Sequence, residues 1–147
     1  MADLSIFATK DNADEGVILP VKINGRKLPL ALKLFGSDSD IVQDFERAKI
    51  RKIGLGKKGK TDVDEEDIEE LLDSQSKSAV MRIGGIYSYD WKKSKVVDDD
   101  PVILDGKTLK NDKESYEYLL EKIPAIRDWV IENSNDRDNF LSEGKKN

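Results

Sequence analysis

Several carboxylates next to a group of aromatic residues are the side chains whose types and spacing could do chemistry in this sequence. Asp90 lies between Tyr89 and Trp91, close to Tyr87, and the acidic residues 98–100 follow this group. Two carboxyl groups beside an aromatic platform are an arrangement that can cleave glycosidic bonds. Acidic loops beside core aromatic residues are nevertheless far more common than such sites. We therefore expect no catalytic residues here.

The absence of histidine and cysteine narrows the chemistry further. Histidine is the usual general base and metal ligand near neutral pH, and the sequence contains none. Without cysteine the chain has no disulfide, no thiolate nucleophile and no zinc–sulfur site, which suits a reducing cytoplasm. Enzymes that use carboxylates alone stay open as a minority interpretation. The sequence predicts a protein that is not an enzyme.

A run of basic residues covers residues 47–60 and ends in a stretch rich in glycine and lysine, residues 54–60. This stretch lacks the Gly-Lys-Ser/Thr ending of a phosphate-binding loop, so we interpret it as a solvated loop. The basic run contains no acidic residue and could follow a phosphate backbone, but no aromatic side chain is interleaved for base stacking. We therefore expect no nucleic-acid partner. Pairing of the run with the acidic residues of a neighbouring copy or of a partner stays open.

An acidic block at residues 62–73 follows the basic run. Carboxylates can bind calcium, but an EF-hand loop also requires ligands at fixed spacings, a central glycine and a glutamate at its end. Neither this block nor residues 98–106 has that combination. The block suits the first turns of a helix, where negative charge interacts favourably with the helix dipole. The sequence thus predicts no metal site and no cofactor.

Length and composition predict one main domain. The chain has 147 residues, of which 37% are hydrophobic and 37% charged, and its net charge is −5. No apolar run reaches the roughly 20 residues that span a bilayer, and residues 1–10 lack the pattern of a secretory leader, so we expect a cytoplasmic protein with no membrane partner. We expect a flexible segment or an edge strand at residues 1–15, a single α+β domain at residues 16–141 and a flexible tail at residues 142–147.

The amino-terminal part of the domain contains a β-hairpin signal. Residues 17–23 and 28–35 are rich in β-forming residues and flank Asn24-Gly25, a pair that accepts the positive φ angles of a type I′ turn. Leucines alternate with other residues in the second run, which predicts one buried face. Pro20 and Pro29 lack an N–H group and favour an edge strand or a bulge.

Two helices are expected after the hairpin. Apolar residues at helical spacing predict the first at residues 38–53. The second is expected to begin at Asp62 or Asp64, and its apolar stripe includes Ile83 and Ile86. Gly84-Gly85 would end or bend this helix. The stretch from Ile86 to Trp91 is ambiguous between a last helical turn and a short strand.

The carboxy-terminal part reads as a short extended segment followed by two helices. After residues 102–104 comes an Asp105-Gly106 turn, and Asn111 or Asp112 can cap a helix that extends to about Ile123. Pro124 fits the first turn of the next helix. Together these patterns predict an α+β fold, in which an amino-terminal hairpin and small antiparallel sheet pack against several helices and the chain ends in a helical pair.

The order of the carboxy-terminal motifs resembles a known protein family. Residues 124–130 read PAIRDWV, residues 136–141 read DRDNFL, and residues 34–39 read LFGSDS where a β-run passes into a basic helix. In this order they resemble the small tail-assembly chaperones of long-tailed bacteriophages of the lambda and HK97 type. The resemblance covers most of the chain from residue 16 to residue 141, and none of its motifs is catalytic.

The resemblance implies a function in protein binding. Such a chaperone binds the phage tape-measure protein in the host cytoplasm, keeps it from aggregating during tail assembly and is absent from the mature virion. The major tail protein and a second copy of the chain are further possible partners. Two alternatives stay open, a structural tail component of the virion, such as a tube or adaptor subunit, and an acidic inhibitor that mimics nucleic acid.

Five apolar residues near the end of the domain are the candidates for partner binding. They either pack in the core or, if several are exposed together, form a binding patch. The residues are Ile126, Trp129, Val130, Phe140 and Leu141.

Overall fold

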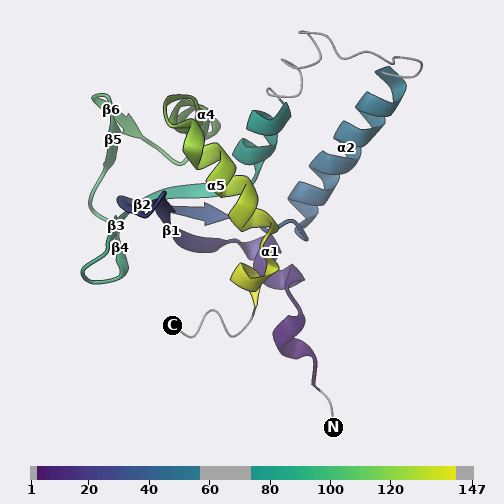
Figure 1. Ribbon diagram of the computed structural model, residues 1–147, viewed down its shortest axis with the longest axis horizontal. Helices are drawn as coiled ribbons and strands as arrows, with labels where there is room; N and C mark the ends of the chain where they lie inside the picture. The colour runs from purple at the N-terminus through teal and green to yellow at the C-terminus, as the bar shows by residue number, and fades with distance from the viewer. Residues whose placement is uncertain (1–2, 57–73, 142–147) are drawn as a thin grey trace.

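The computed structural model describes residues 3–56 and 74–141, which form a mixed α+β fold (Figure 1). The larger sheet is antiparallel and contains, in spatial order, β1 (Val17–Ile23), β2 (Arg26–Leu34), β3 (Ile83–Asp90) and β4 (Lys95–Val97). A small sheet pairs β5 (Val102–Leu104) with β6 (Lys107–Leu109). The α-helices are α1 (Lys10–Glu15), α2 (Asp40–Gly56), a helix at residues 74–81, α4 (Lys113–Lys122) and α5 (Pro124–Asn135), and the 3-10 helices are η1 (Ser5–Phe7) and η2 (Arg137–Phe140). The predicted α+β class and the carboxy-terminal helical pair are confirmed.

The predicted hairpin is formed by β1 and β2. Asn24 and Gly25 have φ angles of 50° and 80°, which are the positive values that a type I′ turn requires. The pairing of Val17 with Leu34 sets a register in which Leu30, Leu32 and Leu34 are all buried. The alternation of leucines in the sequence therefore predicted the correct buried face.

Both prolines of the hairpin lie where a missing N–H group is tolerated. Pro20 lies in the edge strand β1, and the register shifts between Pro20 and Lys22. Pro29 lies in the part of β2 that faces this irregularity. The carbonyl oxygen of Leu28 accepts a hydrogen bond of 2.6 Å from Nε1 of Trp91, so a side chain replaces a bond of the sheet ladder here.

Strand β3 corrects the prediction for the middle of the chain. The expected helix includes Ile83 and Ile86, but the helix at residues 74–81 ends earlier and both isoleucines lie in the strand. The glycines did not end a helix. A Cβ atom at Gly85 would lie 2.7 Å from the hydroxyl oxygen of Tyr87, so the tyrosine ring covers the glycine within one strand. The ambiguous stretch before Trp91 is thereby resolved as β-structure.

Helix α2 begins close to the predicted place. The Oγ atom of Ser39 accepts a hydrogen bond of 3.3 Å from the N–H group of Val42, as an N-cap residue does. The helix continues to Gly56 and thus includes the first residues of the loop predicted at residues 54–60. The rest of that loop, and the helix start predicted at Asp62 or Asp64, lie outside the described residues.

The carboxy-terminal part follows the predicted order and adds a strand. Asp105 and Gly106 have φ angles of 51° and 77°, and they join β5 to β6, a three-residue strand that the sequence did not reveal. The side chain of Asp112 caps α4 by accepting a hydrogen bond of 2.8 Å from the N–H group of Ser115. Pro124 lies in the first turn of α5, as expected.

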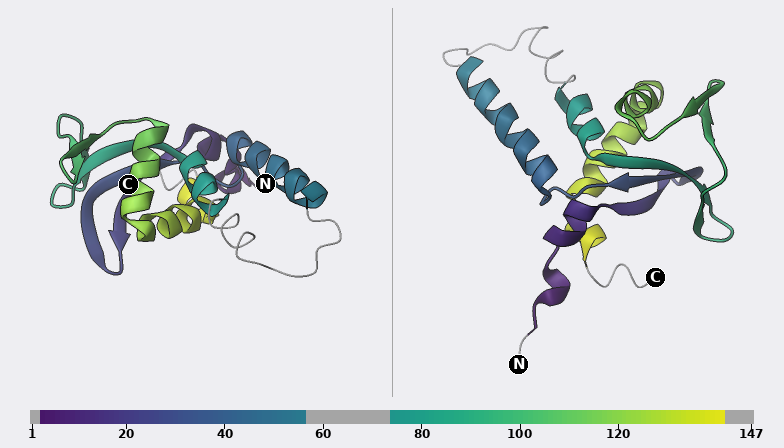
Figure 2. Two further views of the ribbon diagram at one scale, coloured as in Figure 1. Left: turned by 90° about the horizontal axis from the view of Figure 1, so that it is seen from above. Right: turned by 180° about the vertical axis from the view of Figure 1, so that it is seen from behind.

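The hydrophobic core lies between one face of the larger sheet and the helices α4 and α5. Figures 1 and 2 show this helical pair against the sheet, with α2 extending away from it. The core residues contributed by the sheet alternate along β2 and β3, whereas those from the helices follow a helical period. They include Leu30, Leu32, Leu34, Ile86, Leu119, Leu120, Ile126 and Val130.

Residues 10–15 differ from the expectation of a loose segment or an edge strand. They form α1, and Ala13 within it is only 1% exposed. A helix of six residues has little stability of its own. It is held by tertiary contacts, including a hydrogen bond of 3.1 Å from the N–H group of Gly36 to the carbonyl oxygen of Ala13. The sequence pattern of so short a segment could not reveal these contacts.

Candidate functional site

Three segments that are distant in the sequence meet at one end of the sheet. They are α1, the connection between β2 and α2 at residues 35–39, and residues 134–140 at the end of α5 and in η2. Figure 1 shows α1 beside the carboxy-terminal turn. We call this region the junction. It contains parts of two motifs on which the family resemblance rests, LFGSDS and DRDNFL.

A buried aromatic ring lies at the centre of the junction. Phe140 is 2% exposed and packs against Gly36, where an added Cβ atom would lie 3.2 Å from Cδ2 of the ring. The same Cβ atom would lie 2.7 Å from Cβ of Ala13. The carbonyl oxygen of Phe140 accepts a hydrogen bond of 2.8 Å from Nδ2 of Asn12, a buried side chain. Only glycine fits between α1 and the ring.

An ion pair on the surface of the junction also joins the two motifs. Arg137 donates from Nε to Oδ2 of Asp38 and from Nη2 to Oδ1, each at 2.9 Å. Oγ1 of Thr9 donates a further hydrogen bond of 2.8 Å to Oδ2 of Asp38. The Arg137 guanidinium lowers the pKa of the Asp38 carboxyl, and the hydrogen bond from the Thr9 hydroxyl lowers it further by a smaller amount. The carboxylate thus connects three segments while remaining charged.

We predict that Asp38→Asn destabilises the protein at neutral pH and has no effect in strong acid. The pKa of Asp38 is lowered on folding from its ordinary value of 3.8. Its charged form therefore adds stability above that value, and this stability is lost as the pH falls through the lower pKa of the folded state. The effect is small because solvent screens the pair. Urea unfolding midpoints of both proteins over this pH range check the prediction. A difference between them that stays constant into acid would contradict it.

A buried arginine connects the junction to α2 and to the helix at residues 74–81. Arg82 is 5% exposed, and its Nη1 atom donates hydrogen bonds of 2.9 Å to Oγ of Ser134 and to Oδ1 of Asn135. Its Nη2 atom lies 3.6 Å from Oε1 of Glu46, which is the nearby opposite charge. Burial lowers the pKa of Arg82, and the charge of Glu46 opposes this effect. Ser134 in turn donates a hydrogen bond of 2.7 Å to the carbonyl oxygen of Phe35.

These contacts connect segments that are distant in the sequence. Among residues 3–56 and 74–141, no group of three or more acidic side chains is placed to hold a metal ion. A hollow of about 570 Å³, lined mostly by polar residue types, lies beside the junction. It is lined by Ala8, Thr9, Lys10, Asp11, Asp38, Asp40, Gln43 and Arg47.

Three of the residues singled out for possible chemistry, Asp90, Tyr89 and Trp91, make structural contacts. Oδ1 of Asp90 accepts hydrogen bonds from the N–H groups of Lys92 and Lys93 at 2.9 and 3.3 Å, which stabilise the turn after β3. The rings of Tyr89 and Trp91 pack edge to face with centroids 5.1 Å apart. These contacts account for Asp90 and both rings without a substrate.

The structure places three of the five carboxy-terminal candidates in the interior of the protein. Ile126 and Val130 are fully buried against the sheet, and Phe140 is buried in the junction. Trp129 and Leu141 are half-buried. The apolar stripe of α5 faces the sheet because this packing removes the apolar surfaces of both elements from water. Of the two alternatives that the sequence left open, core packing describes Ile126, Val130 and Phe140.

The apolar side chains that do reach the surface lie elsewhere. Leu4 and Phe7 are 72% and 63% exposed, and Ile18 and Ile103 are 42% and 60% exposed. For Leu4 and Phe7 the sequence contained one indication of exposure: they lie in a polar segment whose apolar residues follow no regular period. Nothing in the sequence distinguished Ile18 from its buried neighbours in β1.

No helix in the described parts of the chain is long and apolar enough to cross a membrane.

A scan against protein-family models, a search of curated proteins and a search of solved structures each returned no significant match.

Proposed function

We propose that this protein is a tail-assembly chaperone of a long-tailed bacteriophage. In this proposal it binds the tape-measure protein in the host cytoplasm, keeps it soluble and is absent from the mature virion. The observation that supports the proposal most is the contact between the motifs LFGSDS and DRDNFL, which the resemblance names separately and which the junction brings together.

Several residues of the two motifs make contacts in the junction that require their residue type. The arginine of DRDNFL pairs with the aspartate of GSDS, and its phenylalanine packs on the glycine of that segment. Its asparagine, Asn139, donates a hydrogen bond of 3.0 Å from Nδ2 to the carbonyl oxygen of Asn133. The first aspartate, Asp136, accepts a hydrogen bond of 3.0 Å from the N–H group of Asp138 and so caps η2. A sequence that keeps one motif has a structural reason to keep the other.

The exposed chemistry is compatible with a binding protein. A chaperone for a long helical client needs apolar side chains at its surface, surrounded by charges, and needs no reactive group. Ile41, Met81 and Ile103 supply such apolar contacts. In this proposal the client contacts these side chains and not the buried face of α5.

Co-expression with the tape-measure protein tests the proposal. We expect the fraction of that protein in the supernatant to rise when this chain is present and the two to elute together. An unrelated acidic protein of similar size, expressed at the same level, is the control for nonspecific effects of charge. If the tape-measure protein is no more soluble with this chain than with the control, the proposed function is wrong.

A structural component of the phage tail is the second candidate. The observation that favours it is the presence, on one chain, of an exposed apolar segment at Leu4–Phe7 and of a sheet face that no helix within residues 3–56 and 74–141 covers, since subunits that polymerise need two such surfaces. A tail component would be retained in purified particles, whereas a chaperone would not.

A further inference from the structure

One face of the larger sheet is apolar and lacks a cover in the described parts of the chain. The register places Leu32 opposite Ile86 on the face that α4 and α5 cover. Residues one position away point to the other face, which we call the outer face. Cross-strand pairs Pro20–Ala31, Ala31–Tyr87 and Tyr89–Val96 lie on it, together with Ile18.

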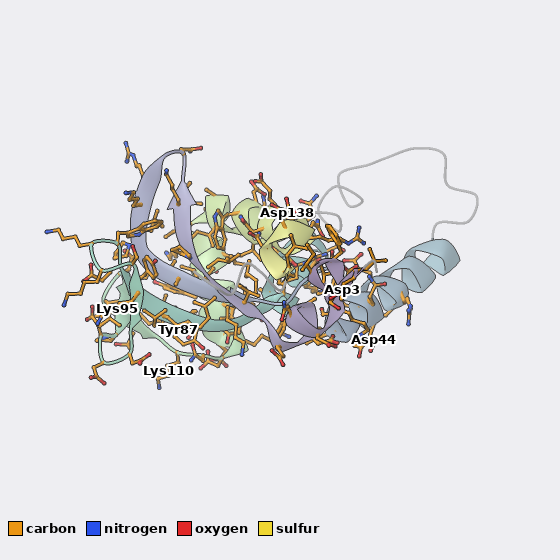
Figure 3. All side chains as sticks on the ribbon, turned by 90° about the horizontal axis from the view of Figure 1, so that it is seen from below. Asp3, Asp44, Tyr87, Lys95, Lys110 and Asp138 are labelled. Atoms are coloured by element: carbon orange, nitrogen blue, oxygen red, sulfur yellow. The ribbon has the colours of Figure 1, made fainter. Side chains whose placement is uncertain are left out.

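The outer face is exposed in part, although Ala31 within it is 0% exposed. In Figure 3, which views the molecule from below, the strands lie in front of α4 and α5 and the labelled Tyr87 lies among the strands. Ile18 is 42% exposed, and Tyr87, Tyr89 and Val96 are half-buried. A contiguous apolar face of this kind marks a surface that another element covers.

An apolar segment of the same chain is available to cover it. Residues 3–9, which we call the arm, contain η1, and none of the three residues of η1 is buried. Leu4, Ile6 and Phe7 are 72%, 37% and 63% exposed. Figure 1 shows that the arm extends away from the body, on the side of the sheet opposite α4 and α5. The arm therefore presents three apolar side chains that have no buried position on their own copy.

The residues at the carboxy-terminal end of the arm are bound to the body of the protein, and these contacts define the direction of the arm. Nζ of Lys10 contacts Oδ2 of Asp14 at 2.8 Å and Oδ1 of Asp40 at 2.9 Å. Oγ1 of Thr9 donates to Asp38, and Asn12 donates to the carbonyl oxygen of Phe140. These contacts support an arm that projects from the body instead of folding back over its own sheet.

Charge complementarity points to a second copy as the occupant. The segment that carries the arm, residues 3–15, has four acidic residues and one lysine. Lys22, Lys27 and Lys33 lie on the same side of the sheet as the outer face, since Lys22 pairs with Lys27 and Lys33 pairs with Ile18. Apolar contact in the centre with opposite charges around it is the usual composition of a specific interface.

We propose that two copies of this chain associate by placing the arm of one copy on the outer face of the other. Phe7 and Leu4 are the apolar anchors, and Ile18, Tyr87 and Tyr89 receive them. Asp3 and Asp11 approach the lysines at the border of the outer face. This association goes beyond the proposed function and does not depend on it.

Sedimentation velocity of the full chain tests the association over a series of micromolar concentrations. The wild type is expected at a mass of at least twice 16.6 kDa. The double variant Leu4→Asp/Phe7→Asp and the variant Ile18→Asp are each expected at the monomer mass, with unchanged circular dichroism. Ile103→Asp is the matched control, because Ile103 is 60% exposed on β5, outside both surfaces, and its association should equal that of the wild type.

Mixing the two defective variants gives a second test. The arm variant keeps an intact outer face and the Ile18→Asp variant keeps an intact arm, so the mixture retains one of the proposed contacts. We expect the mixture to associate, more weakly than the wild type, whereas neither variant associates alone. A monomeric wild type overturns the proposal, as does an arm variant that keeps the wild-type mass or a mixture no more associated than its components. A monomer that solubilises the tape-measure protein would refute only this association, and a dimer that does not would refute only the proposed function.

Discussion

Replacing Phe140 with alanine is expected to lower the free energy of unfolding by about 3 to 5 kcal/mol. The ring is 2% exposed and lies between α1 and Gly36, so its removal leaves a cavity where three segments meet. Ala13 and Gly36 are backbone neighbours that cannot move into this space without breaking the hydrogen bond between them. Urea unfolding followed by circular dichroism measures the change.

A matched variant separates the position of this ring from its chemical type. Phe7→Ala removes the same atoms from a side chain that is 63% exposed, and at a protein concentration low enough for the chain to be monomeric its cost should stay within about 0.5 kcal/mol. Gly36→Ala attacks the same contact from the other side, because its Cβ atom would lie 2.7 Å from Cβ of Ala13. An effect of Phe140→Ala as small as that of Phe7→Ala would mean that the junction is not packed as described.

Replacing Arg82 with alanine is the second change with a large expected effect, a loss of about 3 kcal/mol. The guanidinium is 5% exposed and donates to Ser134 and Asn135, so the variant leaves polar atoms without these donors and opens a space between helices. It also removes the partner of Glu46, which is one-third exposed and can be solvated in part. Thermal and urea unfolding give the loss.

A double variant distinguishes the charge of Arg82 from its packing. Arg82→Met fills much of the same space, and adding Glu46→Met removes the carboxylate that the arginine faces. We expect the double variant to be more stable than Arg82→Ala, because a buried ion pair can be replaced by apolar groups of similar volume at low cost. A double variant as unstable as Arg82→Ala would show that the hydrogen bonds to α5 carry the effect instead of the ion pair.

Local sequence signals predicted the elements whose structure is decided locally. The Asn24-Gly25 turn, the Asp112 cap and the place of Pro124 each depend on backbone geometry within a few residues, and each is confirmed. The prediction failed at Ile83 and Ile86, because their spacing fits a helical stripe as well as a strand, and pairing with β2 decided the outcome.

Whether the candidate residues are buried or exposed depends on contacts between segments that are distant in the sequence. The apolar stripe of α5 indicated that Ile126 and Val130 need a cover, but not that the sheet supplies it. The burial of Phe140 depends on Gly36 and Asn12, which are more than one hundred residues away in the sequence. The docking of α1 has the same origin. Sequence reasoning therefore found part of the junction but left open whether its apolar residues pack in the core or face a partner.

The molar ratio of this chain to the tape-measure protein, before and after tail assembly, tests the proposed function most directly. Quantitative mass spectrometry can measure it in complexes isolated from infected cells before tails form and again in purified virions. A chaperone that leaves on assembly predicts a constant, substantial ratio in the early complexes and a ratio near zero in virions. A chain that is absent from the early complexes, or retained in virions at the same ratio, would contradict the proposal.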